Sequence, residues 1–183
     1  MKALVKAEAG PGLVLRDVPE PEAHPGEVLI RVLWTGICGT DLHIRSWDAW
    51  AQTAVKPPVV LGHEFCGEVI ETGPKTGKEF RPGTTVVSFP LMRAGGSIHL
   101  TGLSPHAPGA YAERVIAEAS LSFAVPNGLD VGTAALTEPM AVALHAVRRS
   151  EIKDAVMKAA KEAEASTRAR ASVQCVGFPI PTF

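Results

Sequence analysis

The chain has 183 residues, 46% of them hydrophobic and 20% charged, which is typical of one globular domain with a small appendage. Its formal net charge of -1 gives no electrostatic reason to expect nucleic acid or an acidic membrane as a partner. No apolar run reaches the roughly 20 residues needed to cross a bilayer, and the N-terminus has no apolar signal-peptide core, so we predict a cytoplasmic protein.

Most of the chain predicts short strands separated by turns. Gly and Pro number 17 and 15, as many tight turns require, and residues 27–34 alternate between polar and β-branched or aromatic side chains after the turn at Pro25 and Gly26. Frequent short strands of this kind indicate a barrel or a sandwich. The predicted strands are 1–5, 13–17, 27–34, 59–61, 65–71, 84–89, 110–117 and 122–125.

The later part of the chain predicts helices. Residues 130–136 form a short one, and Pro139 is well suited to be the first residue of a second, 140–149, because the first turn does not need its missing N–H. Residues 153–171 are rich in Ala, Lys, Glu and Arg and predict a third helix. The remaining residues, 173–183, predict a loose tail.

The three cysteines, Cys38, Cys66 and Cys175, are too few and too widely spaced to form a disulfide framework. Cys66 lies in an apolar, strand-like run and is interpreted as a small buried hydrophobic residue. Cys38 differs, because glycines on both sides permit a sharp turn that brings a thiolate close to an ion. A lone cysteine is more often buried and inert, so this interpretation needs a second ligand.

That second ligand is offered by His63, which is followed by Glu64. A thiolate, an imidazole and a carboxylate that meet on one ion favour zinc, and three protein ligands with an open position are typical of a catalytic site. Each of these side chains also has an ordinary structural interpretation: a lone histidine near a strand end is more often a hydrogen-bonded residue.

Three further side chains are candidates with competing interpretations. Thr40 and His43 could pass a proton from a metal-bound alcohol to solvent, although either alone would be taken as a solvated turn residue. Glu138, just before Pro139, is either a residue favourably placed at a helix N-terminus or a carboxylate near the metal. No Gly-x-Gly-x-x-Gly follows a strand, so the sequence shows no dinucleotide-binding unit.

Residues 1 to about 150 resemble the N-terminal catalytic domain of the zinc-dependent medium-chain alcohol and polyol dehydrogenases. The segments that carry the resemblance are 36–43, 62–69, 80–83, 109–113 and 138–147. It implies a mainly β protein with some α: a GroES-like, partly open β-barrel with short helices over 1–150. The C-terminal helix and loose tail predicted over 151–183 would follow it, with no Rossmann domain.

The resemblance also implies a role for each candidate residue. Cys38 and His63 would bind one catalytic zinc ion, Glu64 would be a third or exchangeable ligand, and Glu138 stands where family members place a further Cys or Glu ligand. Thr40 and His43 would form the proton relay. A glutamate at position 138 points toward the polyol, threonine and butanediol branch. Hydride would pass to NAD or NADP, and the substrate would be a small alcohol or polyol.

Two departures from the family pattern lead to further predictions. Ala94, Ser97 and Leu100 stand where the family's structural-zinc lobe usually carries cysteines, so we predict no second zinc. The chain would also need a Rossmann-domain partner to supply NAD(P).

Two hypotheses of function remain. One is that the chain is the substrate- and zinc-binding half of a dehydrogenase. The other is a non-catalytic zinc-binding module or inactive fragment, which would expose its hinge face and self-associate as a homo-oligomer.

Overall fold

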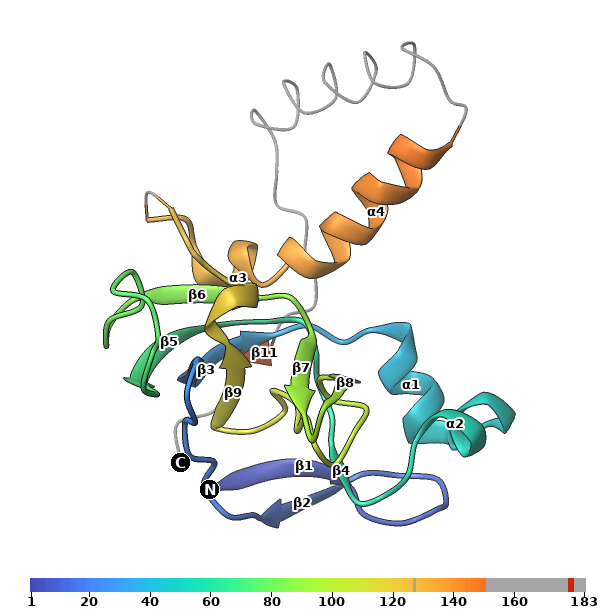
Figure 1. Ribbon diagram of the computed structural model, residues 1–183. Helices are drawn as coiled ribbons and strands as arrows, with labels where there is room; N and C mark the ends of the chain where they lie inside the picture. The colour runs from blue at the N-terminus through green and yellow to red at the C-terminus, as the bar shows by residue number, and fades with distance from the viewer. Residues whose placement is uncertain (127, 151–177, 180–183) are drawn as a thin grey trace.

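The strands in the described part of the chain form open sheets and no closed barrel (Figure 1), which agrees with the partly open, mainly β domain that the resemblance implies. The computed structural model describes residues 1–126, 128–150 and 178–179. The helix predicted over 153–171 and most of the predicted tail lie outside these residues. The strands are β1 Lys2–Lys6, β2 Val14–Asp17, β3 Glu27–Thr35, β4 Val59–Val60, β5 Phe65–Thr72, β6 Thr85–Ser88, β7 Leu91–Ala94, β8 Ser97–Leu100, β9 Arg114–Glu118, β10 Ser122–Ala124 and β11 Phe178–Pro179.

The six-stranded sheet has the order β10-β6-β5-β3-β11, and β9 also pairs with β3. Strand β3 is central because its alternating side chains pack on both neighbours: Val28, Ile30 and Val32 are buried. They form one cluster with residues of β5, β6 and β9, including Val69, Val86 and Val115. This cluster is the main core, and the C-terminal end of β3 leads directly to Cys38.

A second, three-stranded sheet has the order β2-β1-β4. The segment 109–113 connects it to the larger sheet, since Gly109 N–H donates to Val60 O and Leu4 N–H to Tyr111 O. The predicted strand 110–117 therefore starts too early in the chain, because the regular strand β9 begins at Arg114. Residues 110–113 instead run alongside the segment that leads to His63.

Helices α1 (Gly39–Ser46) and α2 (Ala49–Ala54) were not predicted. They pack through Ile44 and Ala51 against Val59 and Leu61. Lys6, which is only 1% exposed, holds the end of α1. Its Nζ lies 4.6 Å from the centre of the ring of Trp47, the residue that caps the C-terminus of α1. The same atom donates hydrogen bonds to Gly10 O and, at 3.2 Å, to Gly12 O. Burial lowers the pKa of Lys6. These contacts fix the helix that begins just after Cys38.

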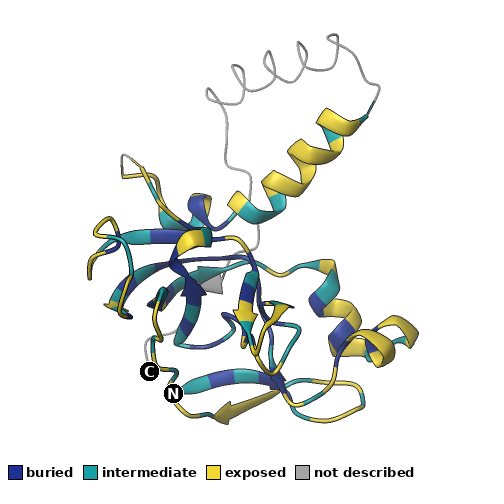
Figure 2. Ribbon diagram, in the orientation of Figure 1, coloured by how far each residue is buried: buried dark blue, intermediate teal, exposed yellow. Residues whose placement is uncertain are grey.

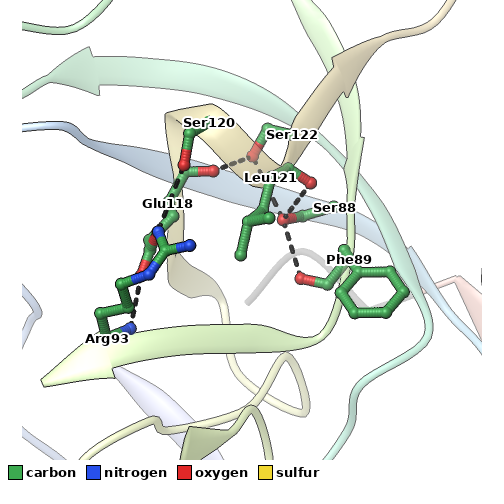
Figure 3. Close-up of polar contacts among 7 residues, drawn as sticks. All are labelled: Ser88, Phe89, Arg93, Glu118, Ser120, Leu121 and Ser122. Atoms are coloured by element: carbon green, nitrogen blue, oxygen red, sulfur yellow. Dashed lines mark hydrogen bonds and ion pairs between the residues drawn. The ribbon is translucent and has the colours of Figure 1, made fainter. Parts of the chain in front are cut away.

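Strands β7 and β8 form a separate hairpin over the stretch in which the family pattern would place structural-zinc cysteines. The hairpin is joined to β9 by Glu118, which is 8% exposed. The Glu118 carboxylate accepts hydrogen bonds from both the backbone N–H and the guanidinium of Arg93, and from Ser120 Oγ at 3.3 Å (Figure 3). An ion pair therefore anchors this hairpin to β9 near its turn.

Helix α3 (Val131–Ala134) covers the larger sheet near β5 and β3, and α4 (Thr137–Arg149) extends away from the sheets (Figure 1). The prediction that Pro139 starts the second helix is wrong by two residues. Pro139 is the third residue of α4, where its missing N–H still has no intrahelical partner to lose. No residue of α4 is buried (Figure 2). Among the described helices, none has the length and apolar character that a membrane crossing requires.

Candidate metal centre

Three of the predicted ligands come together at one end of the larger sheet. Ligand atoms of Cys38, His63 and Glu64 all lie within 4.8 Å of one another, and no other cluster of three such residues occurs in the part of the chain that the structure describes. Cys38 ends the segment after β3 and caps α1, while His63 and Glu64 lie between β4 and β5. Two segments of the chain therefore contribute a thiol, an imidazole and a carboxyl group to one point.

Glu64 is 7% exposed, and Gly36 leaves the space that its carboxylate occupies. A Cβ atom at position 36 would overlap Glu64 Oε2, so any larger residue there would displace the carboxylate from its observed position. Burial raises the pKa of Glu64, the neighbouring His63 opposes that rise, and the charges of Glu138 and Asp41 reinforce it. A cation at this position would stabilise the charged carboxylate against burial and against the negative charges of Glu138 and Asp41.

His63 is buried and its Nδ1 atom has no hydrogen-bond partner. The nearest acid is Asp41, whose Oδ1 lies 3.9 Å from His63 Nδ1 and is also buried without a partner. A carboxylate behind a ligand histidine fixes the tautomer and orientation of the ring in metal sites. Asp41 therefore belongs to the site, although the sequence analysis did not select it.

The other predicted site residues lie outside this cluster. Glu138 is half-buried at the start of α4, and its charge reaches Glu64, but it is not among the three clustered donors. His43 is exposed on α1, where its Nδ1 is paired with Asp48 and its ring lies 5.9 Å from that of Trp50. Thr40 lies in the first turn of the same helix. The structure thus assembles three of the four proposed ligands.

A cleft of about 630 Å³ opens beside the cluster. One wall contains Cys38, Glu64 and residues 34–37, and the opposite wall comes from α3 and the start of α4. Asp130 lines this second wall and caps α3 by accepting the Thr133 N–H at 3.0 Å. The cleft is large enough for a small molecule to reach the thiol and carboxyl groups.

Comparisons with known proteins give the family of the chain. The family model "Alcohol dehydrogenase GroES-like domain" matches residues 24–127. The chain belongs to this family. It is 49% identical over 156 residues to L-threonine 3-dehydrogenase of Streptomyces avermitilis, and this match covers 79% of this chain and 45% of that protein. The L-threonine 3-dehydrogenase of Streptomyces coelicolor is 46% identical, with the same coverage of both chains. The GroES-like chain thus spans less than half the length of these curated relatives.

Solved structures of the family share its fold. The 2R,3R-butanediol dehydrogenase of Bacillus subtilis is 32% identical, with a TM-score of 0.72 over 83% of this chain and 48% of that one. A structure from Sinorhizobium meliloti 1021, described as a zinc-binding dehydrogenase bound to NADP, is 33% identical with the same TM-score over 83% of this chain and 46% of that one. The predicted fold class, a mainly β GroES-like domain with short helices, is confirmed.

The two described cysteines should differ in reactivity. Cys66 is fully buried, and burial, reinforced by the charge of Asp130, raises the pKa of its thiol to about 11, whereas Cys38 is half-buried on the cleft wall. In a Cys175→Ser background without metal, we expect one thiol to react quickly with a disulfide reagent at neutral pH and the other to react only after unfolding.

The fast thiol should disappear in Cys38→Ser, persist in Cys66→Ala, and be protected by one equivalent of zinc. Two fast thiols in the folded, metal-free protein would contradict the burial of Cys66. Rapid labelling that zinc leaves unchanged would contradict the assignment of Cys38 as a ligand.

Proposed function

We propose that this domain is the zinc- and substrate-binding half of a zinc-dependent alcohol or polyol dehydrogenase. The observation that carries the proposal is the convergence of Cys38, His63 and Glu64 within 4.8 Å beside an open cleft. Two protein ligands of this set, a thiolate and an imidazole, select zinc over magnesium or calcium, and the cleft leaves a coordination position for substrate.

The donor set fits a zinc ion. His63 Nδ1 lies toward Asp41, which leaves Nε2 as the ring nitrogen that can bind metal. Cys38 and Glu64 then supply the sulfur and oxygen ligands, and Glu138, whose charge already reaches Glu64, is the candidate to replace or join it. When bound, zinc would act as a Lewis acid toward the oxygen of an alcohol or ketone substrate.

The protein's own side chains would take the alcohol proton outward. Thr40 and His43 lie one helical turn apart on α1, so their side chains share one face of that helix. Asp48 pairs with His43 Nδ1, and a hydrogen bond from the Ala51 N–H, followed by that from His43, lowers the pKa of Asp48 and keeps it charged. A charged Asp48 favours hydrogen on Nδ1 and leaves His43 Nε2 to accept the proton near the surface.

The hydride acceptor would be NAD or NADP held by a Rossmann domain. The relatives are about twice as long as this chain, and one similar structure is bound to NADP. Helix α4 supports docking of such a domain, because Met140, Val142 and Leu144 are exposed along it. Since the similar curated proteins are L-threonine 3-dehydrogenases, L-threonine is the substrate to test first, followed by vicinal diols.

The test joins residues 1–150 to the second half of the Streptomyces avermitilis relative, and also mixes the two parts as separate chains. We expect zinc-dependent reduction of NAD or NADP by a secondary alcohol only when both halves are present. The Cys38→Ser variant of the same fusion is the matched control. Zinc bound at one equivalent with no turnover in any combination would reject the dehydrogenase and leave a non-catalytic zinc-binding module.

A further inference from the structure

Tyr111 touches every segment that builds the metal centre. Its hydroxyl lies 3.0 Å from Gly36 O, two residues before Cys38, and 2.9 Å from Asp41 Oδ2 on α1. Both partners are acceptors, so the single hydroxyl hydrogen is shared between them. Burial, with the negative charges of Asp41 and Glu64 nearby, raises the pKa of Tyr111 well above its usual range and keeps that hydrogen in place.

Asp41 carries this contact to the ligands. Its Oδ2 also accepts the Cys38 N–H at 2.9 Å, while its Oδ1 has no partner and lies 3.9 Å from His63 Nδ1. The carboxylate is only 3% exposed, so water cannot replace a lost hydrogen bond easily. With Tyr111 and Cys38 holding Oδ2, the other oxygen is fixed toward the imidazole.

The rest of Tyr111 supports the segment that carries His63. Its backbone N–H donates to Leu61 O at 2.8 Å, and its ring lies against Gly62, where an added Cβ would overlap ring atoms. Gly62 has a φ of 94°, a conformation that favours glycine, so the chain passes closely beneath the ring immediately before His63. One tyrosine thus contacts the approach to Cys38, the helix after it and the approach to His63.

We propose that Tyr111 is a positioning residue for the metal centre, holding Asp41 and the Gly36 carbonyl so that Cys38 and His63 meet on one ion. This inference rests on the proposed zinc site. A tyrosine with only a packing role would change stability when altered but would leave the metal's affinity and geometry unchanged, which separates the two roles experimentally.

The test compares zinc affinity in Tyr111→Phe, which removes only the hydroxyl, and in Ser122→Ala. Ser122 is the matched control because its buried hydroxyl donates to Glu118 O at 2.8 Å within the main sheet and touches no proposed ligand. We expect Tyr111→Phe to weaken zinc binding about 10-fold, as loss of an outer-shell partner typically does, and to alter the absorption spectrum of bound Co²⁺. Ser122→Ala should change neither.

A double-mutant cycle with Asp41→Asn completes the test. If Tyr111 acts through Asp41, the double variant should bind zinc no more weakly than the poorer single variant. Equal affinity and an identical cobalt spectrum in wild type and Tyr111→Phe would overturn the role of Tyr111, as would additive losses in the cycle. Absence of zinc binding by the wild type would reject the metal site itself, so the two failures are distinguishable.

Discussion

Cys38→Ser and His63→Ala should each weaken zinc binding by more than the about 10- to 100-fold that loss of an outer-shell partner costs. Each variant removes one of the three donors that the structure holds within 4.8 Å, and among the described residues no second thiol or imidazole joins this cluster. Competition with a chromogenic chelator measures the affinity. Cobalt substitution distinguishes the variants, because the sulfur-to-cobalt charge-transfer band should vanish in Cys38→Ser and remain in His63→Ala.

The controls for this prediction are Cys66→Ala and His99→Ala. Cys66 is buried in the sheet, and both ring nitrogens of His99 already have partners, Ala94 O and Ser104 Oγ, so neither residue is free to bind zinc. Both control variants should keep wild-type affinity.

Zinc affinity should also depend on pH. Because burial raises the pKa of Glu64, protons compete with the metal for this carboxylate, and zinc affinity should fall as the pH falls. The Glu64→Gln variant should reduce this dependence. Undiminished binding by Cys38→Ser would contradict the site.

The sheets were predictable because strand β3 and its neighbours follow a local rule. The predicted strand 27–34 differs from the observed Glu27–Thr35 by one residue, since alternating β-branched side chains in that range are those that fill the core. Helices α1 and α2 were missed because the first begins with Gly and contains Thr, Asp and His, which are poor helix formers. Tertiary contacts, such as the burial of Ile44, stabilise it instead.

The ligands were predictable for a related reason, and the residues that position them were not. Cys38, His63 and Glu64 lie in short segments whose residue types already suggest a metal. Tyr111 and Asp41 are 70 residues apart in the chain, and the predicted strand 110–117 concealed the crossing segment that brings them together. In residues 91–100, the two-residue loop Gly95-Gly96, with both glycines at positive φ, is a hairpin signal that was overlooked, but nothing in the local pattern indicated that this hairpin is fastened to β9.

The contacts between Glu118 and Arg93, which attach that hairpin to β9, should make the second large difference, here to stability. We expect Glu118→Ala to lower the free energy of unfolding by about 1.5–3 kcal/mol, the usual contribution of a hydrogen bond to a charged group. The variant removes the acceptor for the Arg93 N–H and the partner of the Arg93 guanidinium, so the hairpin loses both contacts to β9 (Figure 3). Denaturant unfolding measures the loss, and hydrogen exchange should show faster exchange at the amides of β7 and β8.

Glu68→Ala is the matched control, because Glu68 pairs with Arg31 at 2.9 Å between two strands of the same sheet but is more exposed than Glu118. An exposed pair contributes at most about 1 kcal/mol, so Glu68→Ala should cost less and should leave exchange in the hairpin unchanged. Arg93→Ala should also cost less than Glu118→Ala, since it keeps the backbone hydrogen bond and removes a guanidinium that is largely in solvent. Equal losses in all three variants would mean that Glu118 contributes only as an ordinary surface ion pair. Unequal losses in the expected order would show that the backbone hydrogen bond to a buried carboxylate holds this part of the fold.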